Sequence, residues 1–433
     1  MEPPVHKKDI FRFWTVVSSA AVLIFLLTRG YIMQPDSPTY IEGSLVRGAA
    51  YPAFLALFRA VFGGGWLTAV VAAQLAGYLA AAYFFVSALK RRAGLSLHWA
   101  LLLHSLLLLV AFRLPLGEKY ILNAILTEGL AFPAWLLFLG VFAEAFFNPA
   151  LQNCVAVAGL GALLAFIRPQ FVFVYPLLAL SGAALVCSGR LKPRFAALAG
   201  VCLVGFAAFA GLLERTWQYE KNGHFVKAQQ VWTQLASAAF YIGRESDAAL
   251  FANPADAALF AKAFKKVDEA ALTEKYRGAV NLPLSIHYDS TFDARRNLVL
   301  SVIAGERGLQ NLSGAESALE LNRGSRALSA PVLRHRWKSA VKLLAAVFLA
   351  YMPAWCMALA CILFFWAVAD FARGGTFEGF FLAAALSATA LNLLVVMAGT
   401  YLSARYTFYN EAMLVAAMLL FADKKMSGSS PGL

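Results

Sequence analysis

The chain has few charged residues, and this scarcity excludes most soluble folds. Only 14% of its 433 residues are Asp, Glu, Lys or Arg, whereas 61% are hydrophobic. Soluble domains typically carry about 25% charged residues. Apolar stretches of about 17 to 25 residues recur along the sequence, and each is long enough to cross the hydrocarbon core as a helix. The sequence therefore predicts an all-α polytopic membrane protein, because only helices or closed barrels satisfy the backbone within lipid.

Metal-binding and disulfide-forming residues are also scarce. Each of the five cysteines lies in an apolar run and behaves as a small hydrophobe, so the cysteines define neither a disulfide framework nor a metal site. The six histidines are scattered without zinc spacing, and no acidic cluster resembles a calcium site. The chain also lacks a glycine-rich phosphate loop and internal repeats. We therefore expect no metal and no cofactor.

The charge balance is strongly basic, with a net charge of +13. In a membrane protein, however, Lys and Arg gather first in cytoplasmic loops, so this excess does not indicate nucleic acid. Basic residues fall in alternate loops, which predicts a multi-pass protein of the plasma (inner) membrane with both termini in the cytoplasm. The basic positions in question are Lys90-Arg91-Arg92, Arg190, Lys192, Arg194, Arg373 and Lys424-Lys425.

Apolar run length predicts about ten transmembrane helices. The basic start of the first one resembles a signal peptide, but no cleavage pattern precedes Arg29, so we expect it to be retained. Arg168-Pro169 interrupts the run 153–188, which favours a helix break with Arg168 facing a polar cavity. We expect the spans at about 12–28, 67–88, 97–112, 124–147, 153–167, 170–188, 196–213, 340–368, 378–400 and 408–422.

The predicted spans divide the chain into four parts. Residues 1–213 form an N-terminal transmembrane bundle, whose first external loop (29–66) includes a short apolar helix at the membrane interface, over 52–64. Residues 214–338 are the only long polar region, and the helical spacing of their apolar residues predicts a small helical extracytoplasmic module. Residues 339–425 supply the C-terminal transmembrane helices, and 426–433 form a flexible tail. Within them, 340–368 is long for one span, so Pro353 kinks it or its first turns lie along the interface.

Asp36 is the first candidate for chemistry. It stands just after the first span, where a lipid headgroup would lie, and a carboxylate there could take a proton from an acceptor hydroxyl. The alternative is that Asp36-Ser37-Pro38 makes a turn or caps a short helix. Glu128 is the second candidate, because an acidic residue in an apolar helix is costly. Five cations near span ends on the same side suggest phosphate binding: Arg47, Arg113, Lys119, Arg168 and Arg405.

These residues resemble the motifs of GT-C type integral membrane glycosyltransferases, such as protein O-mannosyltransferases and aminoarabinose transferases. Asp36-Ser-Pro-Thr-Tyr40, Arg47 and Tyr51-Pro52 are similar to the stretch "Asp-Ser-x-x-Tyr … Arg-x-x-x-Tyr-Pro" of the first external loop. In the same order follow Leu126-Thr127-Glu128, the break Gly159 to Arg168-Pro169, and Arg405-Tyr406 before the last span. The family's "Arg-Tyr-x-x-Pro" has Tyr409 here instead of proline, and its soluble domain after the last span is replaced by the insertion 214–338.

The resemblance implies a glycosyltransferase that takes a sugar from a polyprenyl-phosphate donor and acts on the extracytoplasmic (periplasmic) face. Its acceptor would be a glycolipid, a polysaccharide or a protein, and membrane lipids would be further partners. By position, Asp36 would be the general base and Glu128 a second acid that orients acceptor or base. Arg47, Lys119, Arg168 and Arg405 would bind the donor phosphate. Candidate substrate-binding residues are Tyr40, Tyr51, Tyr406 and His287.

Two other functions remain open from the sequence. An O-antigen ligase or polymerase would place its site within 214–338, at residues such as Arg244, His287, Arg295 and Arg296, and would not need Asp36. A lipid-linked sugar flippase or transporter would need charged residues near the bilayer midplane and two related halves. In this chain the ionisable residues gather at span ends, which favours an enzyme.

Overall fold

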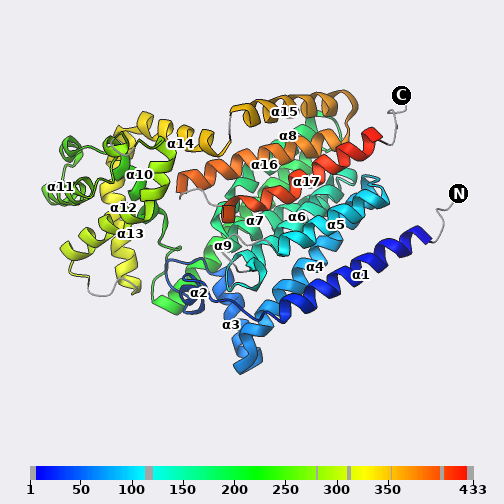
Figure 1. Ribbon diagram of the computed structural model, residues 1–433, viewed down its shortest axis with the longest axis horizontal. Helices are drawn as coiled ribbons and strands as arrows, with labels where there is room; N and C mark the ends of the chain where they lie inside the picture. Colours follow the sequence, from blue (N-terminus) through cyan, green and yellow to red (C-terminus); the bar gives the residue numbers. More distant parts are fainter. Residues whose placement is uncertain are drawn as a thin grey trace.

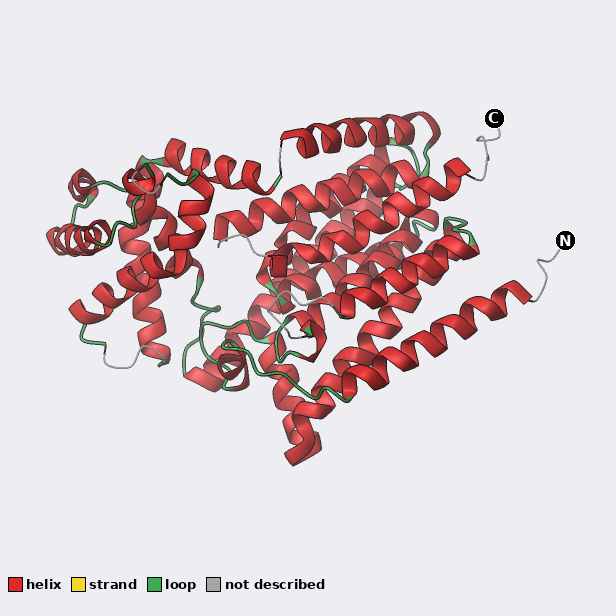
Figure 2. Cartoon of the chain, in the orientation of Figure 1, coloured by secondary structure: helices red, strands yellow, loops and turns green. Residues whose placement is uncertain are grey.

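The computed structural model describes residues 6–112, 120–278, 281–309, 314–352, 354–399 and 404–426. Every regular element in these ranges is helical (Figure 2), and the β pairing there is one isolated parallel bridge between Ile32 and Ala124. The predicted all-α architecture is thus confirmed for the described part of the chain.

Ten long helices pack side by side into one bundle (Figure 1), which buries the largest hydrophobic cluster of the protein. Their sequences are almost wholly apolar, so the bundle interior and much of its outer surface are hydrophobic, as lipid requires. The bundle consists of α1 (His6–Leu27), α4 (Trp66–Arg92), α5 (Leu97–Ala111), α6 (Glu128–Phe147), α7 (Leu151–Ile167), α8 (Val174–Cys187), α9 (Pro193–Asn222), α15 (Ala354–Gly374), α16 (Phe377–Gly399) and α17 (Ala404–Met426).

Seven helical stretches in the described residues are long and apolar enough to cross a membrane. They correspond to α1, the continuous stretch Ala50–Arg92 that ends with α4, α6, the stretch from Pro169 through α8, α9, α15 and α16. Helices α5 and α7 are equally apolar but only 15 and 17 residues long. The expected last span, 408–422, lies in α17, which is not among the seven. The chain is therefore a helical membrane protein, and each expected span falls on helical residues, although 340–368 covers parts of two helices.

The loops with alternating basic charge meet at one end of the bundle. Arg91 and Arg92 pair with Glu144 at the end of α6. At the same end, the amide of Ser96 before α5 donates to Asp423 in α17, and Lys424 pairs with Glu378. The first turn of α1 and the last turn of α17 lie on this side as well (Figure 1). We call it the basic end, and the opposite end, which carries Asp36, the site end.

Two of the expected apolar runs contain a break between helices. Helix α7 ends at Ile167, and the extended backbone of Arg168 leads into a 3₁₀ turn, η3 (Pro169–Phe173), before α8 begins. This is the break predicted at Arg168-Pro169. The stretch 340–368, however, is not one span, because it divides between α14 (Trp337–Tyr351) and α15. Proline lacks the backbone donor that a continuous helix needs, and Pro353 itself lies outside the described residues.

The region 214–338 forms a helical module beside the site end (Figure 1), with a hydrophobic core of its own. A second cluster joins α10 and α12 to α14 and to the last turns of α16, around Tyr241, Phe292, Leu343 and Val396. The module therefore begins only after α9, which runs on to Asn222, and it extends to α14. Its helices are α10 (Val231–Ile242), α11 (Pro254–Glu269), α12 (Leu284–Glu306) and α13 (Ala315–His335), with the 3₁₀ turns η4 (Glu245–Leu250) and η5 (Glu274–Arg277).

The first loop contains two helices that do not join the bundle. Helix α2 (Ser37–Ile41) is a single turn, and α3 (Ala50–Phe62) is followed by the 3₁₀ turn η1 (Gly63–Gly65) and α4. Helix α3 buries Tyr51 and Leu55, whereas Leu57, Val61 and Phe62 are exposed. This amphipathic segment matches the short apolar helix predicted over 52–64.

Candidate functional site at the end of the bundle

The segment 120–127 holds the site end together. It contains a 3₁₀ turn, η2 (Ile121–Asn123), and exchanges backbone hydrogen bonds with Ile32 of the first loop. The buried Asn123 amide donates to the carbonyls of Leu26 and Gly30 at the end of α1. Ser37 Oγ donates to the carbonyl of Ile125 at 2.9 Å. The segment therefore fixes the loop with Asp36 next to the start of α6, where Glu128 lies.

Asp36 forms an ion pair with Arg47 across the first loop. Arg47 Nη2 lies 2.6 Å from Asp36 Oδ1, and the two side chains are 14% and 38% exposed, respectively. Arg47 Nε also donates to Thr39 Oγ1 at 2.8 Å, and the guanidinium lies over the ring of Tyr40. Asp36 occupies the N-cap position of α2, but its side chain makes no capping hydrogen bond. Of the alternative roles in a turn or a cap, Asp36 does stand in the turn before α2, but its carboxylate is directed to Arg47 and not to the helix amides.

Two buried tyrosines extend this pair toward the bundle. The rings of Tyr40 and Tyr51 meet edge to face with centroids 5.4 Å apart, a favourable aromatic geometry. The Tyr51 hydroxyl donates to Gln74 Oε1 at 2.8 Å. The Gln74 amide in turn donates to the carbonyl of Leu122. The described contacts thus run without interruption from Asp36 to the start of α6.

Gly129 is required by this arrangement. A Cβ atom built at this position would lie 2.3 Å from Gln74 Nε2, far inside the contact limit. Glycine permits the Gln74 side chain to lie directly on the first turn of α6. The glycine after Glu128 therefore serves the close approach between α4 and α6.

Glu128 and Arg168 form a second ion pair, which is buried. Glu128 Oε1 lies 2.7 Å from Arg168 Nη1, and the two side chains are 0% and 8% exposed, respectively. Thr127 Oγ1 donates to the other carboxylate oxygen, and Arg168 Nη1 donates to the Tyr409 hydroxyl at 3.0 Å. Arg168 was expected to face a polar cavity, and in this structure its guanidinium contacts the Glu128 carboxylate and the Tyr409 hydroxyl. A buried charge needs such partners, since leaving it unpaired is costly.

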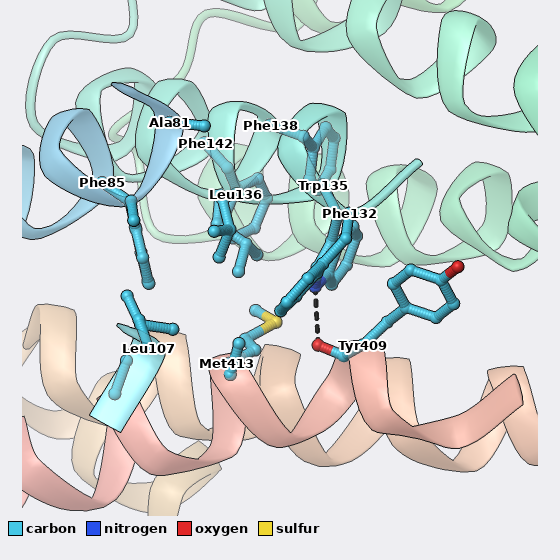
Figure 3. Packing of buried hydrophobic residues seen from close by; sticks show 14 of the residues in the cluster. Ala81, Phe85, Leu107, Phe132, Trp135, Leu136, Phe138, Phe142, Tyr409 and Met413 are labelled. Atoms are coloured by element: carbon cyan, nitrogen blue, oxygen red, sulfur yellow. Dashed lines mark hydrogen bonds between the residues drawn. The ribbon is translucent and has the colours of Figure 1, made fainter. Parts of the chain in front are cut away.

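Aromatic packing holds Tyr409 in place beneath this pair. Figure 3 shows Trp135 of α6 beside Tyr409 of α17, with Trp135 Nε1 donating to the Tyr409 carbonyl at 2.8 Å. Phe132 lies against the same tyrosine. Tyr409 stands where the resembled motif has proline, and the sequence analysis assigned it no role. A tyrosine at a motif position within an apolar helix was the only signal that could have pointed to it.

The structure does not bring all of the predicted site residues together. Lys119, like Arg113, lies outside the described residues, and the side chains of Arg405 and Tyr406 are not described. His287 lies in α12 of the module, 4% exposed, and within the described residues its contacts are internal to the module. The predicted placement of His287 among substrate-binding residues therefore draws no support from its position.

His287 belongs to a buried polar cluster around Arg295. Arg295 is fully buried and donates to Ser237, Leu272, Tyr288 and Thr291 oxygens. Tyr241 lies 3.1 Å from His287 Nδ1. Burial lowers the pKa of His287 and the pKa of Arg295, the latter to about 10, and burial raises the pKa of Tyr241 to about 12. These hydrogen bonds are typical of a structural hub.

No protein-family model, curated protein or solved structure matches the chain. Within the described residues, no group of three or more His, Cys, Asp or Glu side chains is placed to hold a metal ion. The candidate site must therefore be judged from its own geometry. It consists of a half-exposed pair, Asp36 with Arg47, backed by a buried pair, Glu128 with Arg168.

Proposed function

We propose that this protein is a membrane glycosyltransferase that moves a sugar from a polyprenyl-phosphate donor to an acceptor outside the cytoplasm. The site end would face the outside, and the basic end the cytoplasm, as the positive-inside rule requires. The single observation that carries the proposal is the Asp36–Arg47 pair at 2.6 Å, which combines a solvent-accessible carboxylate with a cation at the end of an apolar bundle.

The reaction would be an inverting displacement at the anomeric carbon. The acceptor oxygen forms a bond to that carbon while its proton passes to the Asp36 carboxylate. The bond between the anomeric carbon and the phosphate oxygen breaks, and the polyprenyl phosphate leaves with the electron pair. Arg47 is placed to stabilise the charge on this leaving group.

The buried pair has a different part in this proposal. Glu128 and Arg168 are almost fully enclosed, so in this arrangement neither would contact the donor. They would hold the start of α6 and, through Tyr51 and Tyr40, the loop that carries Asp36 and Arg47. We therefore assign them as positioning residues.

The lipid part of such a donor needs apolar volume within the bundle. A cavity of about 210 Å³ lies between α6, α7, α8, α9 and α16 and is lined almost entirely by apolar side chains, among them Phe142, Ala158 and Leu178. It lies toward the basic end, below the break at Arg168, and offers room for part of an isoprenoid chain.

The ligase alternative receives less support. Of its four candidate residues, Arg295 and His287 are buried in internal hydrogen bonds. Arg296 is engaged with Asp293 at 3.0 Å.

Mass spectrometry of envelope glycans, glycolipids and glycoproteins tests the proposal. Cells that lack the protein are complemented with the wild type, with Asp36→Asn, or with the control Asp268→Asn, whose carboxylate pairs with Lys275 in the module. We expect a one-sugar mass increment to be lost with Asp36→Asn and retained with the control. Full retention of the sugar increment with Asp36→Asn would exclude Asp36 as the base. It would favour the ligase alternative, whose site lies in the module. Uptake of lipid-linked sugar by proteoliposomes without any covalent product would instead indicate a transporter.

A further inference from the structure

A polar cavity of about 310 Å³ lies beside the first loop and is separate from both ion pairs. It is enclosed by α3, by the turn after α2, by the first residue of α4 and by the last turns of α9. Its floor is apolar, formed by Pro52 and Leu55. Its polar lining consists of Glu42, Arg59, Trp66, Trp217 and Lys221.

The cations of this cavity differ from those of the candidate active site. Arg59 makes no ion pair or hydrogen bond within the described part of the chain, and the Lys221 ammonium contacts only the ring of Trp217, at 5.4 Å from its centre. Arg47 and Arg168 are both paired with carboxylates. Two cations without protein counter-ions that line one cavity favour an anionic ligand.

Trp217 gives a second, independent indication. Its indole Nε1 is buried, yet among the described residues it has no hydrogen-bond acceptor. Indole nitrogen can only donate, and buried donors in folded proteins normally have a partner. The Trp217 ring already lines the cavity, so a small rotation of the indole would bring this donor to an acceptor oxygen next to the two cations, as in a phosphate group.

The level of the cavity along α9 points to the membrane surface. The apolar run of this helix ends at Leu213, and Glu214 and Arg215 follow. Trp217 and Lys221 lie about 6 and 12 Å further along the axis, which corresponds to the headgroup layer. Next to it, Leu57, Val61 and Leu212 are exposed, as expected where acyl chains begin. Trp66 and Trp217 fit this position, because tryptophan is enriched at the boundary between membrane and water.

We infer that this cavity binds the phosphate of a lipid headgroup, with Arg59 and Lys221 as counter-ions and Trp217 donating a hydrogen bond to a phosphate oxygen. Glu42 lies in the same lining and offers a partner for an ammonium group. A phosphodiester headgroup with a primary amine matches both signs of charge. This site does not depend on the proposed transfer reaction.

A bound lipid would also hold the loop that carries Arg47. Gln218 Nε2 donates to the carbonyl of Arg47 at 2.8 Å, and Asn222 Nδ2 donates to the carbonyl of Gly43 at 3.0 Å. Both donors lie in the same turns of α9 as Trp217 and Lys221. A phosphate that joins α3 to these turns should therefore reduce amide hydrogen exchange over residues 43–48.

Native mass spectrometry of the purified full chain tests this site. The protein is titrated with phosphatidylethanolamine or phosphatidylglycerol, and lipid retention is compared between the wild type, the double variant Arg59→Gln/Lys221→Gln, and Trp217→Phe. Arg215→Gln is the matched control, because Arg215 is an exposed cation of the same helix outside the cavity. We expect retention to fall about tenfold or more in the double variant and about fivefold in Trp217→Phe, with no change in the control.

Two results would overturn the phosphate site, and a third would overturn its selectivity for a headgroup with an amine. The first is equal loss of lipid in the double variant and in the control. The second is displacement of the lipid by millimolar inorganic phosphate, which would identify a site for soluble phosphate. The third is an unchanged preference for phosphatidylethanolamine in Glu42→Gln, which would remove Glu42 from the site. Unchanged thermal unfolding without added lipid shows that each variant is folded.

Discussion

The two ion pairs of the site end have the same chemistry but opposite surroundings. Asp36 and Arg47 lie on a loop, 11 residues apart, with side chains 38% and 14% exposed. Glu128 and Arg168 lie at the ends of two bundle helices, 0% and 8% exposed. Water screens the first pair, so it adds little to stability and remains accessible to a ligand. The second pair is shielded from water, so the attraction between its two charges is screened much less.

This difference separates a role in chemistry from a role in structure. An accessible pair can exchange its partner for a substrate at small cost, whereas a buried pair cannot. Tyr40 and Tyr51 extend from Arg47 to Gln74, which lies against Gly129 next to Glu128, so the first turn of α6 can fix the position of the accessible pair. Substitutions should therefore affect activity and stability in different proportions at the two places.

Glu128→Gln should have the largest effect on stability. It removes the carboxylate charge that lies 2.7 Å from the buried Arg168 cation, which costs about 3 to 5 kcal/mol of unfolding free energy. Asp36→Asn should cost less than about 1 kcal/mol, because its pair is partly solvated. Denaturant unfolding of the purified chain in detergent measures both. Equal losses would show that the difference in burial has no energetic consequence.

The double variant Glu128→Gln/Arg168→Met should recover most of this stability. Both charges of this ion pair are removed together, so the unfolding free energy should return to within about 2 kcal/mol of the wild type. Sugar transfer should stay impaired, because the start of α6 no longer positions the first loop. A stable double variant with full transfer activity would limit the buried pair to a structural role.

Arg47→Lys tests the accessible ion pair, Asp36 with Arg47. Lysine can still reach Asp36, but it loses the simultaneous donation to Thr39 and the stacking on Tyr40. We expect the transfer rate to fall about tenfold, with unfolding changed by less than about 1 kcal/mol. Arg215→Lys, outside the site, is the matched control. A rate equal to that of the wild type would show that only the charge of Arg47 matters.

The smallest predicted effect is a pH dependence of stability that is caused by His287 in the module. Burial, aided by Arg295, lowers the pKa of His287 below its ordinary value of 6.5 in the folded protein. Below pH 6.5 the unfolded chain therefore binds a proton that the folded chain resists, and stability falls as the pH decreases to the folded pKa. Thermal unfolding at pH 7.5 and 5.5 should show this loss. His287→Gln should flatten it, and an unchanged slope would assign the dependence to other groups.

Several features of the fold could be predicted locally. Length and composition of the apolar runs are enough to indicate a helical membrane protein, because a run of this kind has no other stable state in lipid. The break at Arg168-Pro169 follows from the missing proline donor, and α3 follows from its short amphipathic pattern. The division of 340–368 at residues 352–353 remained one of two alternatives, because a proline can bend a helix as well as end it.

The candidate site could be predicted only in part. Motif positions indicated Asp36, Arg47, Glu128 and Arg168, but not which acid pairs with which base. Gln74 and Tyr409 carried no chemical signal, because an amide or a tyrosine in an apolar helix is common. Their roles depend on contacts 23 and 241 residues away in the chain, with Tyr51 and Arg168.

The sequence by itself determined the class of protein, the positions of its helices and the collection of charges near helix ends. These properties depend on the solvent that each segment requires, and that requirement is local. Only the tertiary structure decided that Asp36 stays accessible while Glu128 and Arg168 enclose each other, and that Arg59 and Lys221 share a cavity with Trp217. The accessibility of a side chain and its pairing are decided when the helices pack. Packing brings together residues that are far apart in the chain, so the local sequence around one residue does not identify its partner.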